Sequence, residues 1–296
     1  MTGSSADSVT GPDGVTGSSR HGVTGFSPRS VLFVPGHRPD MLAKVARSRP
    51  DAVIVDLEDA VAPAAKEQAR DTATSALAAE RPGVDRVLLR INGVGTPWYD
   101  ADVAAAATAI GAGHLDGVVL PKYEHPGELT ALRAALPAGA LVIVGLESAL
   151  GVADARTLLA ERPDAAYFGA EDYIADLGGR RTREGTEVLY ARSQVCLAAR
   201  LAGVPALDQV VVAVHDAEAF RADAEQARAL GFPGKICLHP IQVGIAHEVF
   251  TPSEAEIEHA RAVLAAAEAG VGLVAGQMVD AVHVTMAKAV LTRRPT

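Results

Sequence analysis

Short apolar runs that alternate with amphipathic stretches are the feature of this sequence that most narrows its possible folds. From residue 30 onward about eight such runs occur, and helical patterns separate most of them. Continuous apolar runs of strand length are typical of parallel strands buried on both faces, and strand–helix alternation is typical of α/β folds. This pattern predicts a TIM (β/α)₈ barrel, with an open doubly wound sheet as the alternative. The predicted strands cover residues 30–34, 52–56, 86–91, 117–122, 141–144, 165–168, 210–214 and 235–238.

The ends of the predicted strands favour the barrel. Almost every strand ends in a polar or charged residue, Gly or Pro, as the active-site edge of a barrel requires. No GxGxxG opens a helix after the first strand, and GxxxxGK(S/T) does not occur, so the usual dinucleotide and P-loop signatures are missing.

The two ends of the chain differ from this alternating part. Residues 1–27 are rich in Gly, Ser and Thr without apolar periodicity, which predicts a disordered N-terminal tail because such a segment buries too little surface to offset its ordering entropy. Residues 28–240 are predicted to form the barrel. Residues 241–296 contain helical stretches at 252–269 and 280–291. They are predicted to form a C-terminal helical extension that packs on the barrel or acts as a lid over a site, on this chain or a neighbouring one.

Composition and charge restrict the partners of the chain. With 296 residues, 49% of them hydrophobic, the chain can bury a large core. A net charge of -9 without a basic stripe argues against nucleic acid. No apolar run reaches membrane-spanning length and no signal-peptide pattern occurs, so no membrane partner and a cytoplasmic location are expected. Cys196 and Cys237 lack CxxC spacing and a His/Cys cluster, which suggests neither zinc nor a disulfide framework.

Two carboxylates follow neighbouring predicted strands. Glu147 comes just after residues 141–144, and Asp172 comes just after residues 165–168. Strand ends of this kind meet at the edge where barrels bind ligands, and carboxylate oxygens suit a hard cation. The two residues therefore predict a Mg²⁺ site. Capping of the following helices is an equally open interpretation from these two residues alone.

Eight motifs, in family order, give the chain a resemblance to the citrate lyase beta subunit-like family of the HpcH/HpaI aldolase superfamily, over about residues 29–291. The motifs are RSVLFVPG, AVIVDLEDAV, RVLLRINGVGT, GVVLPK, VGLES, FGAEDYIADLG, GKICLHPIQ and GQMVD. The resemblance implies a TIM barrel that binds Mg²⁺ and cleaves or forms a carbon–carbon bond beside a coenzyme A thioester. It also implies a homo-oligomer, a trimer or hexamer, in which the C-terminal segment closes the site of a neighbouring subunit.

The resemblance also implies roles for individual residues. The family's metal ligands fall on Glu147 and Asp172, and its oxoacid-binding arginine falls on Arg90. Its acid/base aspartate falls on Asp280, and Arg38 corresponds to an arginine associated with substrate or CoA phosphate contacts.

The chemistry of these residues leaves structural alternatives. Arg90 is expected to bind a carboxylate of the 2-oxoacid with two parallel hydrogen bonds, against a plain ion pair as the alternative. Asp280 is expected to exchange a proton with the acyl-CoA carbon, although its position before the last helix also fits an N-cap. His239, which precedes Pro240, is expected to be a packed or capping residue rather than a base.

Further charged residues are candidates for substrate binding. Glu58 and Asp59 are expected to act through metal-bound water or Arg90, with helix capping as the alternative. Lys122, at a strand end, either meets an anionic group or pairs with these acidic residues. Lys44, like Arg38, is a candidate for the CoA phosphates, with simple solvation as its alternative.

Together these assignments predict a Mg²⁺-dependent carbon–carbon lyase. It would reversibly cleave a short 3-hydroxyacyl-CoA, such as malyl-, citramalyl- or hydroxymethylglutaryl-CoA, into a 2-oxoacid and an acyl-CoA. A malyl-CoA thioesterase is the second enzymatic possibility. The third possibility is a non-catalytic barrel or a citryl-thioester lyase subunit that needs companion subunits. The presence of Arg90, Glu147, Asp172 and Asp280 speaks against this third possibility.

Overall fold

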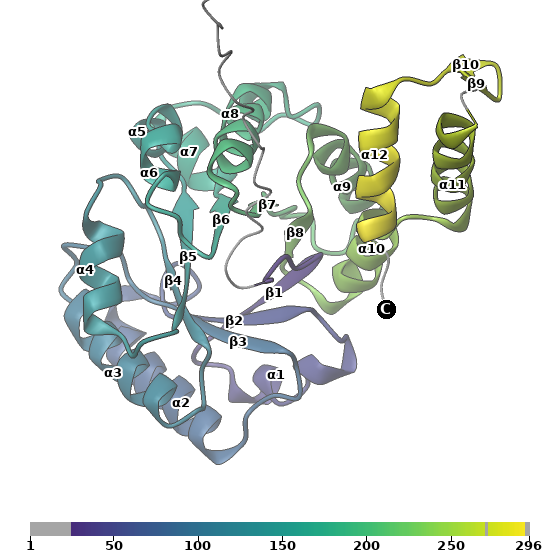
Figure 1. The fold of residues 1–296 in the computed structure, drawn as a ribbon. Coiled ribbons are helices and arrows are strands. Elements are labelled where there is room, and N and C mark those ends of the chain that lie inside the picture. The colour runs from purple at the N-terminus through teal and green to yellow at the C-terminus, as the bar shows by residue number, and fades with distance from the viewer. Residues whose placement is uncertain (1–24, 270–271, 294–296) are drawn as a thin grey trace, which may run out of the picture.

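The computed structural model describes residues 25–269 and 272–293, and eight parallel strands in this part of the chain close into a barrel (Figure 1). Each strand pairs with its neighbours in sequence, and β8 pairs with β1. The predicted TIM barrel is therefore confirmed, and an open sheet is ruled out because each of these strands has two partners. The strands are β1 (Ser30–Pro35), β2 (Ala52–Asp56), β3 (Arg86–Arg90), β4 (Gly117–Leu120), β5 (Leu141–Leu146), β6 (Ala165–Phe168), β7 (Ala206–Asp208) and β8 (Gly234–Cys237).

Helices surround the barrel and bury their apolar faces against it (Figure 1). In α2, for example, the buried residues Ala69, Ala73 and Leu77 recur every four positions, as expected for one face of a helix. A second apolar cluster, which includes Ile54, Leu88 and Ile143, is formed by alternate residues of the strands and fills the barrel interior. The surrounding helices are α1 (Pro39–Leu42), η1 (Val45–Arg47), η2 (Pro63–Ala65), α2 (Lys66–Ala79), α3 (Tyr99–Gly111), α4 (Glu128–Ala135), α5 (Ala149–Ala153), α6 (Ala155–Leu159), α7 (Ala170–Asp176), α8 (Thr186–Ala202), α9 (Ala217–Leu230) and α10 (Pro240–Phe250).

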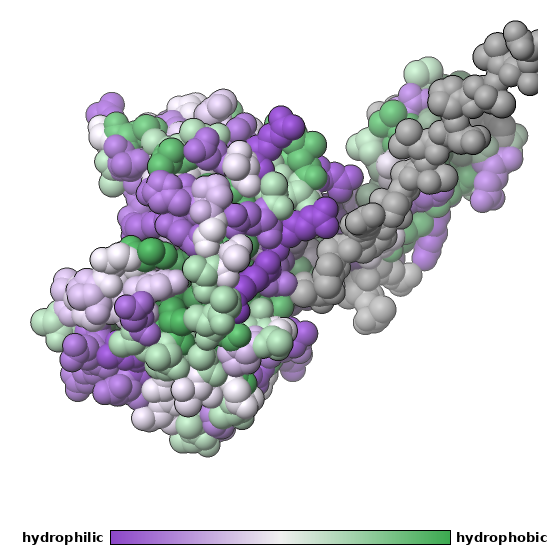
Figure 2. All heavy atoms as spheres, turned by 60° about the vertical axis from the view of Figure 1, so that its left-hand side comes forward, coloured by the Kyte–Doolittle hydropathy of each residue, from purple (hydrophilic) through white to green (hydrophobic). Residues whose placement is uncertain are grey.

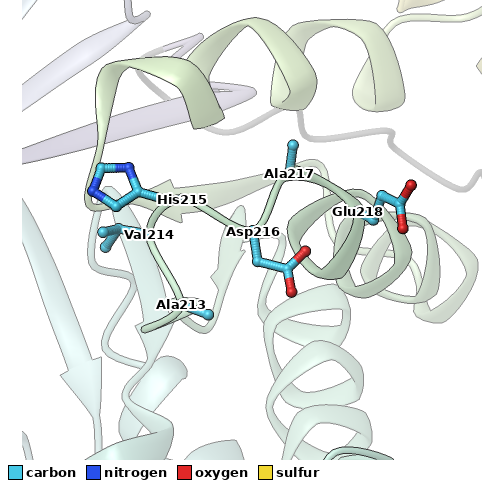
Figure 3. A pocket seen from close by; sticks show the side chains of 6 residues that line it. All are labelled: Ala213, Val214, His215, Asp216, Ala217 and Glu218. Carbon is cyan, nitrogen blue, oxygen red and sulfur yellow. The ribbon is translucent and has the colours of Figure 1, made fainter.

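The seventh strand differs from the prediction, which was wrong in placing it at residues 210–214. The strand is β7, where Ala206 pairs with Ala166 of β6 and Leu207 pairs with Gly234 of β8. Residues 210–214 belong instead to the loop before α9, and Val212 is 57% exposed. A run of Val residues has a high strand propensity, but burial between two neighbouring strands decides which segment enters the barrel. Figure 3 shows a surface cavity that the end of this loop lines together with the start of α9.

The C-terminal extension consists of α11 (Glu254–Glu268), a short hairpin of β9 (Leu273–Val274) and β10 (Gln277–Met278), and α12 (Ala281–Thr292). The two helices pack on each other through a small core of their own and lie at one side of the barrel, near α9 and α10 (Figure 1). An ion pair of 2.7 Å between Arg228 of α9 and Glu256 of α11 links the extension to the barrel.

The barrel extends beyond residue 240, its expected C-terminal boundary. Helix α10, which begins at residue 240, packs on β1, β8 and α9, so the eighth β/α unit continues beyond the expected boundary. Of the expected N-terminal tail, residues 1–24 lie outside the described residues. None of the described helices combines the length and the apolar character needed to cross a bilayer.

Candidate metal and substrate site

Three carboxylates meet at the mouth of the barrel where the strands end. Glu147 follows β5, Asp172 lies in the first turn of α7 just after β6, and Asp59 follows β2. One oxygen of each lies within 4.8 Å of the others. Glu147 is buried, Asp172 is half-buried and Asp59 is exposed, so the group opens from the barrel toward solvent. The structure therefore brings the two predicted ligands together and adds Asp59, for which an indirect role was expected.

Two glycines leave the space that the Glu147 side chain occupies. A Cβ atom on Gly145 of β5 would lie 2.1 Å from Oε1 of Glu147, and one on Gly169, after β6, would lie 2.5 Å from its Cγ. Either added atom would displace the carboxylate, because both distances are far below van der Waals contact. Glycine within a strand often marks such a close approach. The backbone thus forms a cradle for one carboxylate.

The electrostatics of this cradle suit a cation. Burial raises the pKa of Glu147 to about 8, and the negative charges of Glu58 and Asp172 add to this rise. Arg90 and a hydrogen bond from Tyr167 act in the opposite direction. A buried carboxylate that is costly to ionise by itself is stabilised by a nearby positive ion, and oxygen donors are the ligands that Mg²⁺ prefers. Asp59, Glu147 and Asp172 therefore fit a hard divalent cation.

This raised pKa leads to a prediction for the metal-free protein. Between pH 4.5, the ordinary pKa, and about 8, the folded state holds a proton on Glu147 that the unfolded state has lost. The folded state is then the one that binds more protons, so the free energy of unfolding should fall as pH rises through this window. Urea unfolding in EDTA at a series of pH values measures it. The matched Glu147→Gln protein should show a smaller decrease, and equal slopes for the two proteins would contradict the assignment.

Arg90 reaches the site from the end of β3, but its pairing differs from the expectation. It donates from Nε and Nη2 to the two carboxylate oxygens of Asp56, at 2.7 and 2.6 Å. Asp56 is its register partner on β2, which explains the pairing. The two parallel hydrogen bonds expected for a substrate carboxylate are thus made within the chain. Arg90 is only 8% exposed, and its Nη1 lies 2.9 Å from Oε2 of Glu58.

Lys122 carries positive charge into the same acidic group. It follows β4 in a left-handed backbone conformation, with φ of 49°, and its ammonium pairs with Glu58. The ammonium also lies 3.7 Å from Asp59 and 3.5 Å from Asp172. Burial opposes its charge, but the carboxylates of Glu58, Glu147 and Asp59 together outweigh burial, so the pKa of Lys122 lies above its usual value. Of the two alternatives left open, the structure shows pairing with the acidic residues.

Glu58 is buried and contacts both Arg90 and Lys122. Its Oε2 is buried and, in the described part of the chain, has no well-directed hydrogen bond despite its closeness to Arg90. Burial, followed by the charge of Asp59, raises the pKa of Glu58, while Arg90 and Lys122 oppose the rise. An incompletely satisfied acidic oxygen beside the three carboxylates is a further sign that the site is built for additional positive charge or a donor group.

The remaining predicted residues have no described hydrogen bond or ion pair with the three carboxylates. Among the described contacts, Arg38 pairs with Asp40 at 2.7 Å in an exposed ion pair, and Lys44 is exposed between α1 and η1. The hydrogen bonds of the Asp280 carboxylate in the described chain stay within the first turn of α12, where it is the N-cap. His239 caps α10, which confirms its expected structural role.

Sequence reasoning missed two residues of the site. Asp56 ends the predicted strand at residues 52–56 but received no role, because its pairing with Arg90 depends on strand register. Tyr167 was not singled out, although its hydroxyl donates a hydrogen bond to Oε1 of Glu147. A signal was present, because Tyr167 is a large aromatic residue beside the small residues Ala165 and Ala166 in the same strand.

With its cluster of carboxylates at the mouth, this TIM barrel belongs to the class of barrels that can bind a metal and an anionic substrate. Residues 29–240 match the HpcH/HpaI aldolase/citrate lyase family, and the chain belongs to this family.

Individual relatives extend the likeness to most of the chain. A citrate lyase subunit beta-like protein of Deinococcus radiodurans is 48% identical over 281 residues, which cover 89% of this chain and 96% of that protein. A (3S)-malyl-CoA thioesterase of Cereibacter sphaeroides is 35% identical, covering 90% of this chain and 94% of that protein. The crystal structure of protein CitE from Mycobacterium tuberculosis in complex with magnesium, acetoacetate and coenzyme A has a TM-score of 0.77 and 35% identity, covering 90% of this chain and 97% of that one.

Proposed function

We propose that this chain is a Mg²⁺-dependent carbon–carbon lyase that cleaves a short 3-hydroxyacyl-CoA, such as malyl- or citramalyl-CoA, into a 2-oxoacid and an acyl-CoA. The observation that carries this proposal is the group formed by Asp59, Glu147 and Asp172 at the barrel mouth. Family membership and the bound magnesium and coenzyme A of the M. tuberculosis structure support it. A cytoplasmic location is part of the proposal, and both cysteines are free thiols, which agrees with a reducing compartment.

In the proposed reaction the substrate hydroxyl loses its proton and its carbon becomes the carbonyl of the oxoacid. The bond between this carbon and the carbon next to the thioester breaks, and the thioester enolate that departs takes up a proton. Glu147, Asp172 and Asp59 would hold the cation, which supplies Lewis-acid polarisation of the substrate oxygen when it is bound. Arg90 would offer Nη1 to the oxoacid carboxylate while Asp56 fixes its guanidinium, and the Lys122 ammonium would add positive charge.

Asp280 would return the proton to the enolate in cleavage, or remove it in synthesis. Because Asp280 lies on the extension, we include in the proposal a homo-oligomer, a trimer or hexamer, in which α12 of one copy reaches the barrel mouth of another. Apolar side chains exposed on the extension support such a contact. They are Leu273, Met278, Val282 and Met286. In Figure 2 hydrophobic and hydrophilic residues lie side by side on the part of the extension that is in view.

The CoA part of the substrate requires contacts of its own. Arg38 and Lys44 remain our candidates for its phosphates, because both are exposed near the first strand's end. The ion pair of Arg38 with Asp40 is exposed, and such pairs contribute little free energy, so a phosphate can replace Asp40 at small cost.

A second candidate function is hydrolysis of the thioester. The relative from C. sphaeroides is a (3S)-malyl-CoA thioesterase of similar length, which supports this alternative. The two reactions differ in their products. Cleavage yields an oxoacid and an acyl-CoA, whereas hydrolysis yields free CoA and the intact hydroxyacid.

The test is a cleavage assay with malyl-, methylmalyl-, citramalyl-, hydroxymethylglutaryl- and citryl-CoA, with and without Mg²⁺. We expect one of them to release an oxoacid, and EDTA to stop the release because the three carboxylates no longer hold a cation. Free CoA without oxoacid would assign the thioesterase function. Turnover of none of them by metal-loaded protein would contradict a stand-alone CoA enzyme and favour a requirement for companion subunits.

A further inference from the structure

Tyr167 lies inside the barrel, where its size is accommodated by one glycine. It belongs to the apolar cluster that fills the barrel and is 2% exposed. Its register partner on β5 is Gly145. A Cβ on Gly145 would lie 2.5 Å from both Cζ and the hydroxyl oxygen of Tyr167, so the ring occupies the space that the glycine leaves. The phenol end therefore reaches the carboxylate that follows β5.

The two carboxylate oxygens of Glu147 have different neighbours. In the described chain both of its hydrogen bonds end on Oε1, one from the Tyr167 hydroxyl and a long one of 3.4 Å from the backbone N–H of Lys122. Oε2 lies on the side of Gly169, whose Cβ would come within 2.7 Å of it. Gly169 is the N-cap of α7, the helix that carries Asp172 in its first turn. One oxygen is thus held by donors, and the other lies beside the glycine that begins the helix carrying Asp172.

We propose that Tyr167 is a positioning residue that holds Oε1 of Glu147 so that Oε2 is presented to the cation shared with Asp172 and Asp59. This inference rests on the proposed Mg²⁺ site. A neutral hydroxyl orients the carboxylate without cancelling its charge, whereas a lysine or arginine at this place would compete with the cation. Donors that orient a metal ligand typically change metal affinity about 10–100-fold when they are removed.

The test is Tyr167→Phe, which removes one oxygen and keeps the ring in place. We expect the Kd for Mg²⁺ of the substrate-free protein, measured by calorimetry, to rise about 10–100-fold, with the same change for Mn²⁺ followed by electron paramagnetic resonance. Raised Mg²⁺ should restore most of kcat in the cleavage assay, because the ligand itself is still present.

A matched control exists in Tyr123, another buried tyrosine whose hydroxyl donates to a glutamate, Glu161, at 2.9 Å. Tyr123→Phe should leave the Kd for Mg²⁺ unchanged. If Tyr167→Phe lowers thermal stability but leaves Mg²⁺ affinity at the wild-type value, the tyrosine has only a packing role and the inference is wrong. If the wild-type protein binds neither ion, the proposed Mg²⁺ site and this inference are both overturned, so the two failures can be told apart.

Discussion

Replacing Glu147 by Gln should lower kcat/KM for cleavage about a thousandfold, because one metal ligand loses its charge. A bound cation typically supplies several kcal/mol of transition-state stabilisation, and about 1.4 kcal/mol corresponds to a factor of ten in rate. Gln has nearly the same shape, so the cradle of Gly145 and Gly169 still accommodates it. Its amide oxygen can still accept the hydrogen bond from Tyr167. The fold should therefore survive, and the loss should lie in Mg²⁺ binding and in the chemical step.

Calorimetry with Mg²⁺ and the cleavage assay together measure this loss. Glu171→Gln is the matched control, since it removes the same charge from the same face of the barrel but lies outside the carboxylate group and pairs with Arg181. It should keep the Mg²⁺ affinity and rate of the wild type. Wild-type Mg²⁺ affinity in Glu147→Gln would show that this residue is not a ligand and would remove the main support for a metal-dependent lyase.

Most of the barrel could be predicted from the sequence because its strands are continuous apolar runs. Seven of the eight predicted segments overlap the observed strands, and the remaining one, at residues 210–214, was misplaced. The true β7, Ala206–Asp208, has only three residues, and one of them is a buried aspartate held by Arg192 and Lys235. No local sequence pattern predicts such a strand, because its acidic residue is neutralised by two basic residues from other parts of the sequence.

The site was predictable to the extent that topology alone determines it. Parallel strands bring their ends to one mouth, so the order of the strands is sufficient to place Glu147 and Asp172 together. Their partners could not be placed in this way, because each pairing depends on register and side-chain reach. Asp56 lies opposite Arg90 on the neighbouring strand, and Tyr167 reaches Glu147 across Gly145. Sequence periodicity gives the face of a strand but not these distances.

The role of the C-terminal extension could be predicted less well than that of the barrel. The sequence placed Asp280 before the last helix, and the structure makes it the N-cap of α12. Its described contacts do not extend beyond that turn, and α11 and α12 pack chiefly on each other. In the proposed function, Asp280 exchanges its proton at the barrel mouth of a second copy. Symmetric oligomers allow such exchange, because every copy gives its extension to one neighbour and receives another.

Chains with Asp280→Asn and chains with Glu147→Gln, each nearly inactive alone, should regain activity when they are co-expressed with different tags and purified as mixed oligomers. A site built from the intact barrel of one chain and the intact α12 of another is complete, and random mixing gives about a quarter of such sites. General acid–base groups typically contribute about 10²–10⁴-fold to the rate, so the recovered activity would be far above that of either parent.

Glu147→Gln mixed with Asp172→Asn is the control, since both changes lie in the barrel and every site remains defective. Recovery in the first mixture alone would place Asp280 in a neighbour's site; none in either, with mixed oligomers present, would mean that Asp280 does not act across copies.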